Sequence, residues 1–148
     1  MADEGGPFLQ AALICERILT EADGTVSAIR IIDRFFITPN PGQPPAATMP
    51  AVVMSHTLFV TFKSGAVHGR LTAKLVFRGP SGLKLQEVSI PVLLEGDERG
   101  ANLIIPYQIQ VEEEGLYWFD VYLDDKLMTK VPFRVIYQAT TFTTPPQL

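Results

Sequence analysis

The chain has 148 residues, a length that suits one domain able to bury roughly two-thirds of its unfolded surface. Its net charge of −4 gives no electrostatic reason to expect nucleic acid or an anionic membrane as a ligand. The single cysteine, Cys15, excludes an intramolecular disulfide, and the acidic start of the chain is unlike a signal peptide. We therefore expect a soluble cytoplasmic protein.

The composition also indicates an interface with another molecule. The chain is 47% hydrophobic and only 19% charged. This is apolar for a small β domain, in which alternate residues normally face water. Part of the outer apolar surface is therefore expected to contact another molecule.

The first elements expected are two strands, from Phe8 to Thr20 and from Thr25 to Phe36, joined by a turn at Asp23-Gly24. Neither face of this hairpin is cleanly apolar. The first arm is also rich in alanine, leucine and glutamate, so an amphipathic helix is the alternative there.

Residues 38–50 contain five prolines, which exclude both a helix and a central strand. We expect a long surface loop within one domain, because the preceding 37 or so residues are too few to hold a core of their own. The functional alternative is a polyproline II docking segment, for which only Pro41 and Pro44 have the P-x-x-P spacing.

Regular alternation of apolar and polar residues then predicts a series of strands, separated by turns at Ser64-Gly65, at Gly79 to Gly82 and at Glu95 to Gly100. Pro91 indicates an edge strand or a bulge. The strands are expected at residues 57–62, 70–78, 88–94 and 103–111.

The clearest element is a hairpin over residues 115–137, with its turn at Asp124, Asp125 and Lys126. A loop of these three residues places Phe119 opposite Val131 on the inner face; it also pairs Tyr117 with Phe133 there and Asp120 with Lys130 on the outer face. Phe119 and Phe133 are therefore predicted to point into the core.

Together these elements predict an all-β fold, an antiparallel β-sandwich of about eight strands that is immunoglobulin-like or C2-like. We expect a single domain over residues 1–148, with a frayed polar tail at residues 139–148.

Several stretches resemble a known group of proteins. They are IRIIDRFFI after the Asp-Gly turn, the proline stretch ending in Met49-Pro50, the GPSG turn, and GLYWFDVYLDD followed by VPFRV. The chain resembles a family of small, uncharacterised bacterial proteins with immunoglobulin-like β-sandwiches. That resemblance implies a fold and a bacterial origin, and it carries over no activity and no site.

The sequence contains no common catalytic motif. His56 and His68 are the only histidines, and neither has a metal-ligand spacing with Cys15. An enzyme built on Cys15, His68 and Asp33 is an alternative, because such partners meet in space rather than in sequence. The glycines lie at turns and open no phosphate-binding helix. We expect no enzyme activity, no metal and no cofactor.

Calcium binding is a further alternative, because acidic residues lie near the expected strand ends, where loops of a sandwich can converge. They lack regular D-x-D spacing, and solvated turn acids explain them more simply. The residues are Asp23, Asp33, Glu95, Asp97, Glu98, Glu112 to Glu114, Asp124 and Asp125.

The candidate binding surface is the outer face of the last hairpin. Trp118 and Tyr122 fall in its polar phase, two residues either side of Asp120, and aromatic anchors beside a charged pair are typical of binding hot spots. The alternative is that another part of the chain covers them. Three residues of the returning arm share this phase: Met128, Pro132 and Ile136.

The expected function is a non-catalytic protein-interaction or assembly module in a bacterial cytoplasmic complex, either with a protein partner or as a homo-oligomer. Nucleic acid and membranes are not expected as partners.

Overall fold

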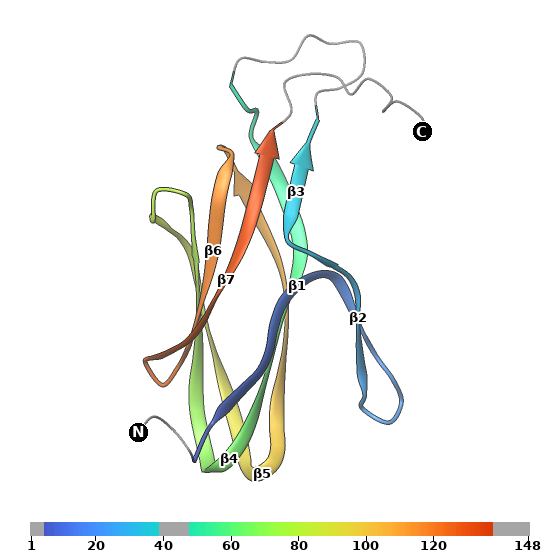
Figure 1. Cartoon of the computed structure of the whole chain (residues 1–148), viewed down its shortest axis with the longest axis vertical. Coiled ribbons are helices and arrows are strands. Elements are labelled where there is room, and N and C mark those ends of the chain that lie inside the picture. The colour runs from blue at the N-terminus through green and yellow to red at the C-terminus, as the bar shows by residue number, and fades with distance from the viewer. Residues whose placement is uncertain (1–4, 39–47, 138–148) are drawn as a thin grey trace, which may run out of the picture.

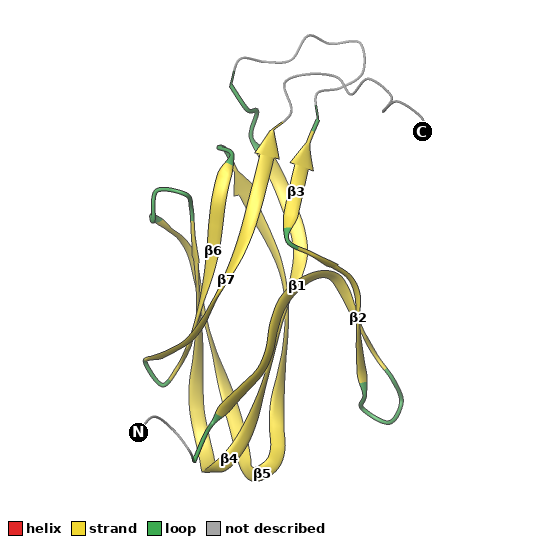
Figure 2. Cartoon of the chain, viewed as in Figure 1, coloured by secondary structure: helices red, strands yellow, loops and turns green. Residues whose placement is uncertain are grey.

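The computed structural model of the chain describes residues 5–38 and 48–137. Within these ranges every regular element is a strand (Figure 2), so no helix there is available to cross a membrane. The first arm is a strand, β1, and not the alternative helix. The predicted tail at 139–148 and most of the proline-rich stretch at 38–50 lie outside the described residues. The strands are β1 (Phe8–Thr20), β2 (Val26–Ile32), β3 (Arg34–Ile37), β4 (Val52–Arg78), β5 (Lys84–Val111), β6 (Gly115–Leu123) and β7 (Lys126–Tyr137).

The central feature is one long hairpin, made of β4 and β5, that is bent across its middle. The two strands pair in antiparallel register from Val52 opposite Val111 to Arg78 opposite Lys84. Both bend where the register shifts, around Gly65 on β4, at the lower end of Figure 1. The expected separate strands at 57–62 and 70–78 are therefore one strand, β4, and those at 88–94 and 103–111 are one strand, β5.

The bend explains why the expected turns at Ser64-Gly65 and at Glu95 to Gly100 do not reverse the chain. Gly65 and Asp97, which pair with each other, both have positive φ, 61° and 54°, and this lets the two backbones turn together. The Ser64 hydroxyl donates a hydrogen bond to the Arg99 carbonyl at 2.5 Å and ties the two strands together at this corner. Paired bends of this kind are how a strand passes from one packed layer to the next.

The bent hairpin folds the sheet over on itself. β1 pairs with the first half of β4, and β6 pairs with the second half, in the strand order β2-β1-β4-β6-β7-β3 with β5 added on β4. The result is a curled half-barrel whose two halves face each other. The prediction of an all-β fold is confirmed, but the count of about eight separate strands is not.

The sheet is mixed, which corrects the expectation of purely antiparallel pairing. The expected strand from Thr25 to Phe36 breaks at Asp33 into β2 and β3, which lie at opposite ends of the strand order. β3 then pairs in parallel with β7, and the Arg134 amide donates a hydrogen bond to the Asp33 carbonyl at 3.0 Å. The break lets one continuous segment contribute to both ends of the sheet.

The core lies between the two halves. Phe119 and Phe133 are 5% and 0% exposed, so the prediction that they point inward is confirmed. The predicted pairs Tyr117–Phe133, Phe119–Val131 and Asp120–Lys130 also form.

The β6–β7 turn differs from the expected three-residue loop. Leu123 pairs with Lys126, so only Asp124 and Asp125 form the turn, both with positive φ, as a type I′ hairpin requires. The expected pairs survive because a bulge near Met128 inserts one extra residue and restores the register.

Candidate interaction surface

The outer face of the second half of the sheet carries the residues predicted to bind a partner. Trp118 and Tyr122 lie on β6, opposite in phase to Phe119, and both are half-buried. Neighbouring strands add cations at positions directly beside them. We define the cation–aromatic face as Lys74, Arg78, Trp118, Asp120, Tyr122 and Lys130.

Asp120 lies at the centre of this face and is only 4% exposed. Arg78 Nε donates a hydrogen bond to Asp120 Oδ2 at 2.9 Å, and Lys130 Nζ lies 3.8 Å from Oδ1. The hydrogen bond to Asp120 raises the pKa of the Arg78 guanidinium. Oδ1 is buried and accepts no hydrogen bond from the described residues, so the lysine supplies charge without a bond. Flanking side chains from three strands therefore bury this carboxylate on an outer sheet face.

Each aromatic ring is matched with one lysine. Lys130 Nζ lies 5.2 Å from the centroid of the Trp118 ring, and Lys74 Nζ lies 4.7 Å from that of Tyr122. Such contacts contribute about 0.5–1 kcal/mol at exposed sites, which is little enough for a partner to displace them. The rings are therefore partly shielded by flexible side chains, and among the described residues no further layer of strands lies over them.

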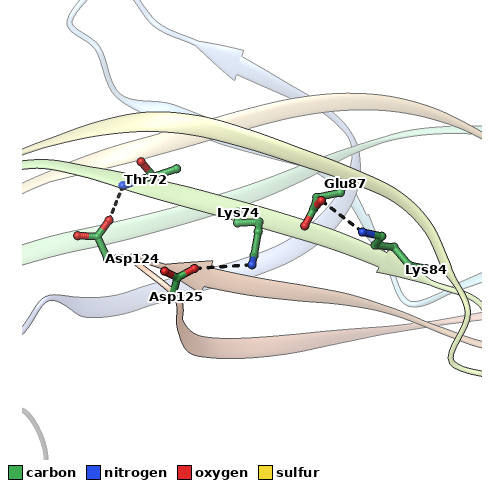
Figure 3. A network of polar contacts seen from close by, with 6 residues as sticks. All are labelled: Thr72, Lys74, Lys84, Glu87, Asp124 and Asp125. Carbon is green, nitrogen blue, oxygen red and sulfur yellow. Dashed lines mark hydrogen bonds and ion pairs between the residues drawn. The ribbon is translucent and has the colours of Figure 1, made fainter.

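The turn at the end of β6 holds this face in place. The Thr72 amide donates to Asp124 Oδ1 at 2.8 Å, and the Asp124 amide donates to the Thr72 carbonyl at 2.9 Å. Figure 3 shows the contact between the Thr72 amide and the Asp124 side chain together with Lys74 Nζ, which lies 3.8 Å from Asp125 Oδ1. The turn acids therefore fix β6–β7 against β4, and they also orient Lys74.

The remaining predicted residues of this surface are placed differently. Met128 packs against the core cluster, because the bulge shifts it out of the outer phase. Ile136 is half-buried opposite Phe36 of β3, whereas Pro132 is exposed beside Trp118. Leu127, which the sequence did not single out, is 46% exposed beside Tyr122.

The charge of this face differs in sign from that of the chain. Within the defined cation–aromatic face, three cations, Lys74, Arg78 and Lys130, lie around one acid, Asp120. Three positive charges and one negative charge give +2, against −4 for the whole chain. The face therefore presents locally positive, aromatic surface.

The structure does not bring the proposed nucleophilic residues together. Cys15 is fully buried opposite Thr57 in the first half of β4, whereas His68 lies opposite Glu95 at the corner. Burial raises the pKa of the Cys15 thiol, which disfavours the thiolate needed for attack. Asp33 is exposed and forms an ion pair with the adjacent Arg34 at 3.0 Å.

The acidic residues weighed as calcium ligands are dispersed. Asp23 caps the β1–β2 turn by accepting a hydrogen bond from the Thr25 hydroxyl at 2.6 Å, while Glu95 lies at the corner and Asp124 at the β6–β7 turn. Across residues 5–38 and 48–137, no group of three or more histidine, cysteine or acidic side chains is placed to hold a metal ion.

Sequence reasoning found the two aromatic anchors and the Asp120–Lys130 pair, but it missed Lys74 and Arg78. Lys74 and Arg78 come from β4, forty or more positions before Trp118 and Tyr122, so no local spacing connects them. Only the cross-strand register between β4 and β6 places them side by side. The burial of Asp120 follows from the same register.

Comparison with known proteins adds a family but no activity. A family model described as a family of unknown function (DUF6941) matches residues 10–136. No curated protein matches the chain.

Proposed function

We propose that this chain, which belongs to the DUF6941 family of unknown function, is a non-catalytic protein-interaction module that binds its partner through the cation–aromatic face. The observation that carries the proposal is the placement of Trp118 and Tyr122 on an outer sheet face, each half-buried and beside a lysine. A sheet face that contacts only water does not require either aromatic ring.

The geometry favours a protein partner for two reasons. Trp and Tyr provide large contact area at low entropic cost, and hot spots combine such rings with desolvated charges. Asp120 already holds Arg78 in a fixed position, so this cation loses little freedom when a partner covers it. Because the face is locally positive, the partner surface is expected to be acidic around an apolar centre.

The setting we propose is a bacterial cytoplasmic complex, in which the chain acts as a subunit or as a homo-oligomer. The buried, unpaired Cys15 is compatible with a reducing compartment. We also propose that the half-barrel is a relative of the immunoglobulin-like sandwiches, because its core lies between two facing halves of sheet.

The test is a double substitution, Trp118→Ser with Tyr122→Ser. Association, measured by sedimentation for self-assembly and by capture of partners from native cells, should weaken by about 2 kcal/mol or more, because two anchors are lost. The melting temperature should stay close to that of the unchanged chain, since neither ring belongs to the core cluster.

The matched control is Ile31→Ser with Ile104→Ser. These residues are 62% and 42% exposed and lie on the other half of the sheet. The control should retain full association. Unfolding of the Trp118/Tyr122 variant, or equal loss of association in both variants, would refute the proposed surface.

A further inference from the structure

The open side of the half-barrel contains a small cavity between the two halves of β5. Its volume is about 140 Å³. Its buried lining comes from both halves of β4, from β5 and from β6, namely Leu58, Leu75, Phe77, Tyr107 and Phe119. Gln86 and Val88 of the first half of β5 face Ile105 of the second half across it.

One residue that lines this cavity, Tyr107, has a polar group that lacks a protein partner among the described residues. Tyr107 is 8% exposed, and no residue of the described ranges hydrogen-bonds to its hydroxyl. The other inward tyrosine, Tyr117, instead donates to the Glu113 carbonyl at 2.6 Å. Leaving a buried hydroxyl unpaired is unfavourable, so the Tyr107 hydroxyl is the kind of group that a ligand would satisfy.

The walls determine what such a ligand can be. The residues that line the cavity in the described part of the chain include no charged side chain, so an ion would lose its hydration without compensation. Rings of Phe77 and Phe119 lie 6.3 Å and 5.0 Å from that of Tyr107 and offer aromatic contacts. A dry apolar cavity of about 150 Å³ is large enough to bind benzene.

An added strand fits this opening less well. Both halves of β5 pair only with β4 among the described residues, so their outer edges are free. Each half contains a proline, Pro91 or Pro106, and a proline interrupts the row of N–H donors that an added strand would need.

We propose that the cavity between the halves of β5 binds a neutral, mainly apolar small molecule, about the size of one aromatic ring, whose single polar group hydrogen-bonds to the Tyr107 hydroxyl. This site is distinct from the cation–aromatic face, because the two share no residue.

Phenol and toluene are the probes, since they have the same size and differ in one hydroxyl group. Titration of the ¹⁵N-labelled full chain, followed by NMR, should show saturable binding of both, with shifts centred on Val88, Ile105 and Phe119. Tyr107→Phe should weaken phenol binding by roughly 3- to 10-fold, the value of one hydrogen bond, and leave toluene within about twofold. Val88→Trp should fill the cavity and abolish binding of both.

Native-like spectra and melting temperatures establish that each variant is folded. If Val88→Trp does not fold, Gln86→Trp, at an exposed lining position, replaces it. Absence of saturable binding of either probe would overturn the proposal, as would binding that survives the blocking substitution. Equal weakening of phenol and toluene by Tyr107→Phe would remove the role assigned to the hydroxyl and would also count against it.

Discussion

Asp120 occupies an outer strand position, where water normally surrounds a carboxylate, yet its side chain is only 6% exposed. Arg78 and Lys130, from the strands on either side, take the place of that water. The same two cations also lie beside Trp118: Arg78 is opposite it on β4, and Lys130 reaches its ring from β7. A single buried acid thus organises the cations that surround the aromatic anchors, and alternation alone would have made it an ordinary surface residue.

His56 provides a pH-dependent test at the scale of one residue. Its ring packs against Phe35, Tyr107 and Phe133, and burial lowers its pKa below the ordinary value of 6.5, although Glu16 partly opposes the shift. The unfolded chain therefore binds the proton first as the pH falls. The contribution of His56 to stability is complete above about pH 6.5 and declines below it, until the folded form is also protonated.

His56→Phe keeps an aromatic ring and removes the titration. Urea unfolding at pH 7.5 and pH 5.5 should show that the unchanged chain loses more stability than this variant between the two values. An equal loss in both proteins would show that His56 does not titrate differently in the folded and unfolded states.

At the scale of elements, the corner of the β4–β5 hairpin converts one long ribbon into two facing halves. The backbone of β5 comes so close to that of β4 at Gly100 that a Cβ built there would overlap the carbonyl oxygen of Phe62. Because the contact is with backbone, no side-chain rotation relieves it. The corner therefore depends on the absence of a side chain at this position.

Gly100→Ala should destabilise the chain by about 2 kcal/mol or more, since the two strands must separate to admit the methyl group. Gly79→Ala is the control, because its added Cβ would come no closer than 3.4 Å to any atom, an ordinary contact with Leu85. Chemical denaturation should show a large difference between the two variants. Similar stabilities would mean that the strands do not approach as closely at the corner as described.

The elements also show how far the sequence alone could lead. The β6–β7 pairing was predictable because alternation on both arms leaves one register with a buried face. The corner of the β4–β5 hairpin was not predictable from the sequence. Glycine-containing stretches such as Ser64-Gly65 and Glu95 to Gly100 allow the chain either to reverse its direction or only to bend. The bend is selected by the pairing of these two stretches with each other, about thirty residues apart, which no local pattern reveals.

For the whole molecule, the two outer faces of the half-barrel differ in character. The face on β4, β6 and β7 alternates cations with aromatic rings. On the first half of β4 and the second half of β5, the outward positions that pair between Val53–Gln110 and Thr61–Asn102 carry no charged side chain. Partner binding is therefore expected at one face of the sheet and not over the protein surface in general.

Site-specific photo-crosslinking in the cell that makes the protein tests this assignment most directly. A benzophenone side chain at Leu127, which is 46% exposed beside Tyr122, should crosslink to a partner or to a second copy of the chain. The same group at Ile104, which is 42% exposed on the other face, should give no such product. Crosslinks from Ile104 and not from Leu127, or equal crosslinks from both positions, would contradict the account.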